Sequence, residues 1–281
     1  MRRRLDGGAQ SAGAGFAGAG AEVSSAIWGQ IGALGRRSIV RTIRQPAAII
    51  FPLIFPMLLL LVNSGGLDAS TKLPGFPTDS FLAFALAVPF IQGALFSTMN
   101  AGTDLAKDVQ TGFLNRLSLT SMRGVALIAG QLAGVVVLGL VQAAFYIAVG
   151  LIVGVDFAAG ALGILVLFAF AAVISISFGA LGAFLALRTG SGEAIQGLFP
   201  LLFVFLFLSS MNTPRNLIGV DWFRFVATAN PVSYLIECVR SLIITGWNGD
   251  ALALGFGFAI LIGVVSSTLA TLSLKGRLLR T

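Results

Sequence analysis

The chain has 281 residues, of which 57% are hydrophobic and only 10% are charged, with a formal net charge of +7. Soluble domains carry about 25% charged residues and disordered chains are poor in apolar ones, so both classes are excluded. Cys238 is the only cysteine and histidine is absent, which excludes an internal disulfide and removes the commonest metal ligand. We therefore expect no metal site, and the composition indicates a polytopic membrane protein.

Two segments precede the first predicted span. Residues 1–21 begin with three arginines and continue in a Gly/Ala stretch that is too glycine-rich for the core of a signal peptide, so we expect a flexible cytoplasmic tail. In residues 22–45, apolar side chains at near-helical spacing are followed by four arginines and then by Pro46. This pattern predicts an amphipathic helix at the cytoplasmic interface, and a basic stop before the first span is the alternative.

Six uncharged runs are long enough to cross a membrane as helices. A span needs about 20 apolar residues, and a charge at the bilayer centre is costly, so charge-free runs mark the candidates. The predicted spans are residues 47–65, 80–101, 124–152, 159–187, 194–212 and 251–273. The predicted fold is an all-α membrane protein with six transmembrane helices, in a single membrane domain over residues 22–281.

The basic residues predict the orientation of these spans. With both termini cytoplasmic, the inner segments hold 14 of the 18 Lys and Arg residues, and Lys72, Arg215, Arg224 and Arg240 remain outside. The positive-inside rule therefore favours cytoplasmic N and C termini. The same distribution accounts for the net positive charge, which marks the cytoplasmic face and does not indicate a nucleic-acid partner.

Catalytic motifs are missing from the sequence. There is no HExxH, CxxC, GxSxG or P-loop pattern, so we expect a protein that is not an enzyme and has no ATP site of its own. The six span cores contain no Asp, Glu, Lys or Arg, which argues against a proton-coupled or ion-coupled transporter. The neutral polar residues in the spans either bond between helices or line a mostly apolar path that suits an amphiphile.

The cytoplasmic segment 102–123, between the second and third predicted spans, is short, charged and helical in pattern. Apolar residues recur every four positions, which predicts one apolar helix face. They are Leu105, Val109, Phe113 and Leu117. A helix of this kind lying along the membrane could present its polar face to a partner protein, and an ordinary amphipathic loop is the alternative.

The external segment between the fifth and sixth predicted spans differs from a polar loop. Three aromatic residues come first, then Asn230-Pro231, and then an apolar stretch that is too short and too charged to cross a membrane. We interpret residues 215–249 as two short interfacial or re-entrant helices before the last span, and an ordinary external amphipathic helix is the alternative.

Two motifs in these segments resemble one known family. The cytoplasmic motif, followed by Met122-Arg123 at the start of a span, is Asp108-x-x-x-Gly112-x-x-x-Arg116-Leu117. The external motif, with Arg240 six residues after its tyrosine, is Asn230-Pro231-Val232-Ser233-Tyr234. Together with the six spans and the amphipathic N-terminal helix, these motifs resemble type-2 ABC exporter permeases of the daunorubicin-resistance branch over almost the whole chain.

The resemblance implies the transmembrane subunit of an ATP-driven exporter in a bacterial inner membrane. It implies no cofactor on this chain, because ATP and Mg²⁺ would be bound by a separate cassette subunit. The other partners would be a second copy or a homologous permease, membrane lipid, and an amphiphilic drug, lipid or glycolipid-like substrate. Two other classes stay open: an ion-gradient-driven secondary transporter or channel without a cassette, and a non-transporting scaffold or immunity protein.

The resemblance also implies two sites. The interface that couples the permease to the cassette would comprise Asp104, Lys107, Asp108, Gly112, Asn115, Arg116, Leu117 and Arg123. The external gate segment would comprise Asn230, Pro231, Tyr234, Glu237 and Arg240. In the coupling interface, Gly112 would permit close approach of the two backbones and Arg116 would supply a charged hydrogen bond.

Overall fold

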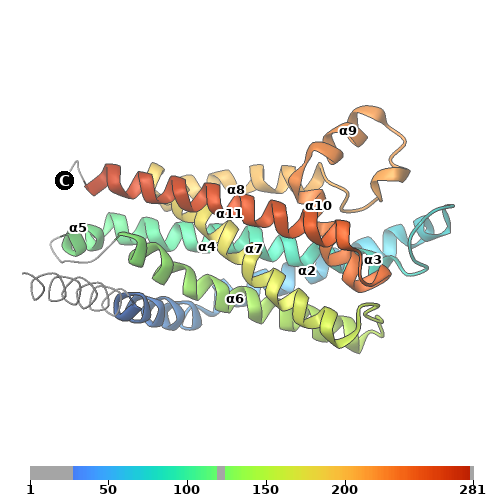
Figure 1. The fold of residues 1–281 in the computed structure, drawn as a ribbon, viewed down its shortest axis with the longest axis horizontal. Coiled ribbons are helices and arrows are strands. Elements are labelled where there is room, and N and C mark those ends of the chain that lie inside the picture. The colour runs from blue at the N-terminus through green and yellow to red at the C-terminus, as the bar shows by residue number, and fades with distance from the viewer. Residues whose placement is uncertain (1–27, 119–123, 279–281) are drawn as a thin grey trace, which may run out of the picture.

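The computed structural model describes residues 28–118 and 124–278. The predicted tail at 1–21 lies outside these residues. The long helices run side by side along one axis, and the N-terminal helix lies at the same end of the bundle as the last turns of the C-terminal helix (Figure 1). We call this the inner end, and the opposite end, where α9 and α3 lie, the outer end.

The regular structure of the described residues is entirely helical, and five of its segments are long and apolar enough to cross a membrane. Their helices are α2 (Pro46–Leu67), α4 (Ala87–Gln110) preceded by the short α3 (Phe81–Ala85), α6 (Gly124–Ile152), α7 (Gly160–Thr189) and α11 (Gly249–Leu278). The prediction of an all-helical membrane fold is confirmed at this level, and each of these five segments overlaps one of the predicted spans, although the second segment continues beyond residue 101 to Gln110.

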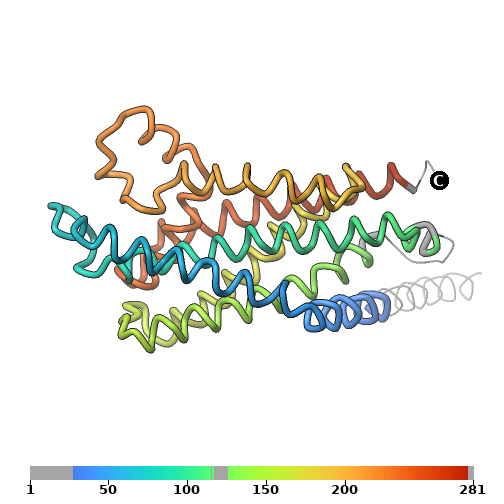
Figure 2. The backbone as a smooth tube through the Cα atoms, turned by 180° about the vertical axis from the view of Figure 1, so that it is seen from behind, coloured from blue at the N-terminus to red at the C-terminus, as the bar shows by residue number. Residues whose placement is uncertain are grey.

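The remaining predicted span, residues 194–212, corresponds to α8 (Gly192–Phe207), which has only 16 residues. At 1.5 Å per residue α8 is about 24 Å long, whereas the hydrocarbon core is about 30 Å thick. Figure 2 shows α8 running from the inner end toward the outer end. The helix stops early because the Asn230 side chain donates to the carbonyls of Phe205 and Leu208, at 2.6 and 3.0 Å.

Shorter elements cap the two ends of the bundle. The inner end carries the N-terminal helix, described over residues 28–43, and α5 (Phe113–Ser118). The outer end carries η1 (Asp68–Lys72), η2 (Arg215–Leu217), α9 (Asp221–Ala229), α10 (Pro231–Arg240) and η3 (Ser241–Thr245). In Figure 1, α9 projects from the bundle, whereas α10 lies within it, packed against α11 and α4.

The centre of the bundle is α4, and its closest neighbour is α7. In the most apolar 18-residue stretch of the span that contains α4, 89% of the residues are buried, whereas 17% are buried in the corresponding stretches of the spans of α2 and α11. The backbones of α4 and α7 meet at two glycines, Gly102 and Gly182. A Cβ atom on Gly182 would lie 2.1 Å from the Thr98 carbonyl oxygen, so only glycine permits this approach.

Side chains from α4 and α6 repair two proline defects in α2. Pro52 has no N–H to donate to the Ala48 carbonyl, and the Asn100 side chain donates to that carbonyl instead, at 3.3 Å. Pro56 likewise leaves the Pro52 carbonyl without its helical donor, and the Tyr146 hydroxyl donates to it at 2.7 Å. Because unpaired backbone groups are costly in lipid, these bonds attach α2 to α4 and α6.

Candidate functional sites at the two ends of the bundle

The predicted coupling segment begins as a continuation of α4. The helix runs without a break to Gln110, and the chain then turns through Thr111 and Gly112 before α5 begins at Phe113. Gly112 has φ of +67°, a left-handed conformation that ends helices and strongly favours glycine. The predicted apolar face is therefore divided between two helices, with Leu105 and Val109 on α4 and Phe113 and Leu117 on α5. The spacing of apolar residues predicted one helix because it carries no information about the turn at Gly112.

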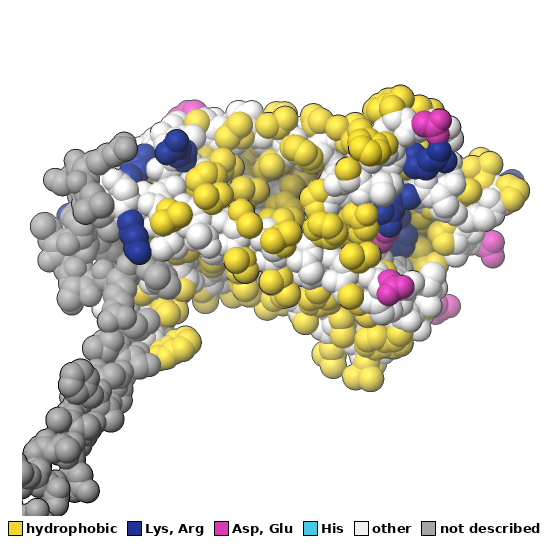
Figure 3. Space-filling model, turned by 45° about the horizontal axis from the view of Figure 1, so that its top comes forward, with side chains coloured by type: hydrophobic (Ala, Val, Ile, Leu, Met, Phe, Trp, Pro, Cys, Tyr) yellow, Lys and Arg dark blue, Asp and Glu magenta, His cyan; other side chains and the backbone are white. Residues whose placement is uncertain are grey.

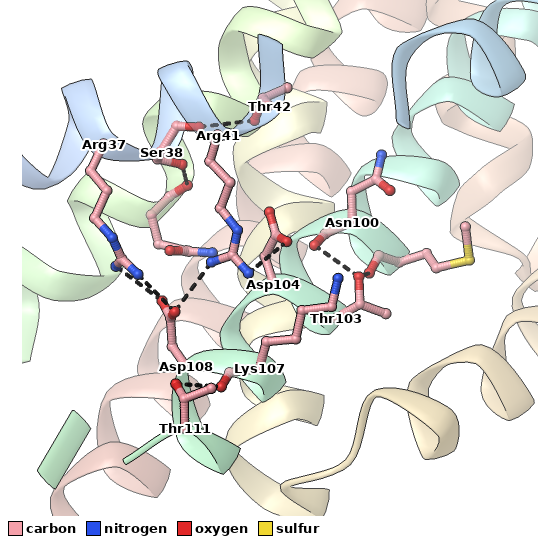
Figure 4. A network of polar contacts seen from close by, with 12 residues as sticks. Arg37, Ser38, Arg41, Thr42, Asn100, Thr103, Asp104, Lys107, Asp108 and Thr111 are labelled. Atoms are coloured by element: carbon pink, nitrogen blue, oxygen red, sulfur yellow. Dashed lines mark hydrogen bonds and ion pairs between the residues drawn. The ribbon is translucent and has the colours of Figure 1, made fainter. Parts of the chain in front are cut away.

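An ionic network joins the end of α4 to the N-terminal helix (Figure 4). The guanidinium of Arg37 donates to both carboxylate oxygens of Asp108, at 2.8 and 3.1 Å, and Arg41 donates to the same carboxylate at 3.2 Å. Arg41 also pairs with Asp104 at 3.1 Å. The side chain of Asp108 is only 6% exposed, so this carboxylate is committed to the N-terminal helix.

Sequence spacing explains why the network forms. Arg37 and Arg41 are four residues apart on one helix, and Asp104 and Asp108 are four apart on the other, so each pair shares one helix face. The Arg37 guanidinium also lies 4.0 Å from the ring centroid of Phe113, at the start of α5. The N-terminal helix, α4 and α5 are thus held together by charges that compensate one another in a largely buried place.

The N-terminal helix is also packed closely against α6. A Cβ atom on Gly130 would lie 2.4 Å from the Cβ atom of Leu34, and one on Gly134 would lie 2.5 Å from the Ser38 hydroxyl oxygen. That hydroxyl donates to the Gln131 carbonyl at 2.8 Å. Because two glycines allow the backbones to approach, the helix that carries Arg37 and Arg41 is fixed on the bundle.

The residues predicted to couple the permease to a cassette fall into two groups. Asp104 and Asp108 face the N-terminal helix, whereas Lys107 and Arg116 are exposed beside the turn at Gly112. Three further predicted members cannot be assigned to either group. The side chains of Asn115 and Leu117 on α5 are not described by the structure, and Arg123 lies outside the described residues. The motif does not indicate Arg37 and Arg41 as partners, although the matching four-residue spacings of the arginines and the aspartates are a signal in the sequence.

At the outer end, Asn230 and Pro231 form the start of α10. The Asn230 side chain accepts from the backbone N–H of Val232 at 3.0 Å while donating to the end of α8, and Pro231 occupies the first helical position. The predicted Asn-Pro element therefore joins two helices: it caps α10 and at the same time satisfies carbonyls that α8 leaves unpaired.

Glu237 and Tyr234, on the next turn of α10, meet residues from the linker after α8. Arg215 donates to Glu237 at 2.6 Å, and its guanidinium lies 4.4 Å from the ring centroid of Tyr234. The Ser210 hydroxyl also donates to Glu237, at 3.2 Å. Arg215 and Ser210 were not among the predicted site residues, because they are more than twenty residues from Glu237 along the chain and a short sequence motif does not include such contacts.

Arg240 is the most buried charged residue in this outer segment, with 7% of its surface exposed. It donates to the carbonyls of Phe84, Ser210 and Met211 at 3.0 to 3.2 Å, and its guanidinium lies 3.5 Å from the Phe84 ring centroid. Burial lowers the pKa of Arg240 to about 9, which still leaves the guanidinium charged at neutral pH. Arg240 thereby joins α10 to α3 and to the linker after α8.

Comparison with known proteins identifies the family. The sequence profile of the ABC-2 type transporter family matches residues 29–244, which is most of the chain, so this protein belongs to that family. The daunorubicin resistance ABC transporter permease protein of Streptomyces coeruleorubidus is 28% identical over 200 residues, which is 69% of this chain and 66% of that protein. The chain thus spans just under two thirds of this relative.

Two further relatives are both named as the provisional transport permease ycf38. The protein of Porphyra purpurea is 25% identical over 264 residues, covering 89% of this chain and 90% of that protein. The protein of Pyropia yezoensis is 26% identical over 226 residues, covering 78% and 76%.

Family membership confirms the class predicted from the two motifs. The chain is a multi-pass membrane protein and a transmembrane permease of the ABC-2 type. The membrane domain of this family lacks an ATPase site and typically carries no cofactor. A permease of this kind implies an ATP-binding cassette subunit as its partner.

Proposed function

We propose that this chain is the membrane subunit of an exporter that moves an amphiphilic drug, lipid or glycolipid-like substrate out of the cytoplasm or the inner leaflet. A separate cassette subunit binds ATP and Mg²⁺ and hydrolyses the ATP, and a second permease, identical or homologous, completes the complex in a bacterial inner membrane. The relative whose name includes daunorubicin resistance supports export of an amphiphile. The charge-free span cores suit such a substrate.

The proposal includes six spans with cytoplasmic N and C termini, so α8 counts as a span despite its length. The direction of α8 and the position of both described chain ends at the inner end support this topology (Figures 1 and 2). The inner end is then cytoplasmic, and the N-terminal helix lies at the cytoplasmic interface. The segment at 215–249 is external and re-entrant in part, since α10 is covered by protein on most of its surface.

The observation that carries the coupling proposal is the turn at Thr111 and Gly112, where exposed Lys107 and Arg116 flank the inner end of α4. We infer that the cassette binds this surface. The 24 residues of α4 span about 36 Å, so α4 can carry a displacement of the turn toward the outer end. Asp104 and Asp108 act as positioning residues, because they attach the N-terminal helix to the part of α4 that moves.

A first experiment tests the exporter class. The chain is expressed with cassette proteins encoded beside it, purified in detergent and assayed for ATP hydrolysis. We expect a stoichiometric cassette subunit with vanadate-sensitive activity and ATP-driven flux in liposomes. Flux driven by an ion gradient without a cassette would identify a secondary transporter or channel instead, and the lack of any flux would favour a scaffold.

A second experiment tests the coupling surface with Arg116→Glu. Charge-assisted hydrogen bonds contribute about 1.5–3 kcal/mol, so reversing this charge should lower ATP-driven transport by about tenfold or more. Membrane insertion should be unchanged, because the side chain is exposed. Lys275→Glu, an equal charge reversal at an exposed position of the inner end, is the matched control. Wild-type transport by Arg116→Glu would remove the docking role.

A further inference from the structure

A cavity of about 610 Å³ opens at the outer end of the molecule, between η2, α9, α10 and the start of α11. Its polar lining includes Arg215, Arg224, Glu237, Arg240, Thr245 and Asn248. We call this cavity the outer pocket. Its volume lies within the range of about 300–1,000 Å³ that is typical of small-molecule sites. Figure 3 shows basic side chains gathered at this end of the molecule, beside acidic ones.

The charges in the wall of the outer pocket are unequal. Three guanidiniums line it, but Glu237 is the one carboxylate among its lining residues. Glu237 pairs with Arg215, and Arg224 pairs with Asp221, whose side chain is 89% exposed and lies outside the lining. Among the residues that the structure describes, the hydrogen-bond acceptors of Arg240 are neutral carbonyls, although the Glu237 carboxylate on the same helix acts on its charge without a direct bond. The wall therefore has excess positive charge, and its most buried cation is not paired with a carboxylate.

The wall is also rich in hydrogen-bond donors. A guanidinium carries five N–H groups, and the three carbonyl contacts of Arg240 use three of them. The carbonyl oxygen of the Asn248 side chain accepts from the backbone N–H of Ala251 at 3.1 Å, so the amide group of Asn248 remains as a donor. A ligand that matches this wall must supply several acceptor oxygens and negative charge, and phosphate provides both.

We propose that the outer pocket binds a phosphate monoester group of an amphiphile, whose negative charge no attached cation balances, at the external end of the permease, with Arg215, Arg240 and Asn248 as donors. The biological meaning of this site rests on the proposed export function, since the ligand would be a molecule that has reached the outer leaflet. The Glu237 carboxylate pairs with Arg215 and acts as an internal anion. Phosphate binding competes with that carboxylate for the guanidinium.

The test measures binding to the purified full-length permease in nonionic detergent by titration calorimetry. The probes are dihexanoyl phosphatidic acid, dihexanoyl phosphatidylcholine and inorganic phosphate. We expect phosphatidic acid to bind at least about tenfold more tightly than phosphatidylcholine, and Arg215→Gln to weaken its binding about tenfold or more. Glu237→Gln should tighten binding, because it frees Arg215. Lys72→Gln removes one exposed positive charge that does not line the pocket, and it should change affinity by less than about twofold.

Each outcome has a defined meaning. Binding of phosphatidic acid but not of inorganic phosphate identifies an amphiphile headgroup as the ligand, and equal binding of both identifies free phosphate, with the same chemistry at the site. Equal binding of the two lipids, or affinities that Arg215→Gln and Glu237→Gln leave unchanged, overturns the proposal, as does the absence of binding. Since Arg240 also holds three carbonyls, the test does not depend on its variants. The assay uses neither cassette nor ATP, so its failure is separate from a failure of the export function.

Discussion

Asp108 illustrates how a single side chain can be recognised from a motif and yet receive its partners only from the fold. The motif marks it beside an exposed coupling surface, but its carboxylate accepts three hydrogen bonds from Arg37 and Arg41 on a helix more than sixty residues earlier. A carboxylate that is 6% exposed and paired in this way belongs to the internal network. The exposed charges of the same segment, Lys107 and Arg116, are the ones free to meet another protein.

This arrangement predicts the effect of Asp108→Asn. The change leaves Arg37 without its anionic partner, whereas Arg41 keeps Asp104. Breaking a fully buried pair costs about 3–5 kcal/mol, and the cost here should be smaller because the Arg37 side chain is 40% exposed. We expect a clear drop in the thermal unfolding midpoint of the purified protein. Asp156→Asn, which removes an exposed carboxylate at the outer end, is the control and should change stability by less than about 0.5 kcal/mol. Equal midpoints for the two variants would show that the network contributes no stability.

At the scale of helices, α2 depends on its neighbours for its own backbone hydrogen bonds. Its two internal prolines leave two carbonyls without helical donors, and the side chains of Asn100 and Tyr146 supply the donors. Few residues of α2 are buried, so these two bonds are important points of attachment to the bundle. A helix with two prolines is thus kept as a span because α4 and α6 complete it.

Tyr146→Phe tests this attachment. The variant keeps the aromatic ring but leaves the Pro52 carbonyl unpaired in a buried place, which should cost about 1–3 kcal/mol. The measurement is the free energy of unfolding in mixed micelles. Tyr234→Phe is the matched control, because the hydroxyl of Tyr234 donates to the Thr228 carbonyl at an exposed site where water can replace it. If the Tyr234 variant lost as much stability as the Tyr146 variant, the proline repair would not be the cause.

The lengths of the helices followed from sequence only in part. Uncharged runs located the five long spans because charge is excluded from the bilayer centre, whatever the tertiary packing. The predicted span extends to residue 212, whereas α8 ends at Phe207, where the Asn230 side chain caps its last turn. Asn230 is more than twenty residues from the end of α8 along the chain, so the local sequence around residue 207 does not indicate this cap.

At the scale of the whole molecule, the proposed topology can be tested by labelling. Burial raises the pKa of the Cys238 thiol to about 12, so this lone cysteine should be almost unreactive toward maleimides near neutral pH. Single cysteines can therefore be introduced into the native chain without first removing Cys238. Thr111→Cys and Asp156→Cys place a reactive thiol at an exposed position of the inner end and of the outer end, respectively. In intact cells we expect a membrane-impermeant maleimide to label only the Asp156 variant. Labelling of the Thr111 variant alone would reverse the orientation.

The sequence by itself determined the class of this protein: an all-helical membrane permease with charge-free span cores and two family motifs in the segments between its spans. These properties depend on composition and short spacings, which act locally in the bilayer. Only the tertiary structure decided that Asp104 and Asp108 face Arg37 and Arg41, that Arg215 meets Glu237, and that Arg240 lines a basic pocket. The physical reason is that each partner is remote along the chain, and close helix packing, as at Gly102 and Gly182, brings such partners together.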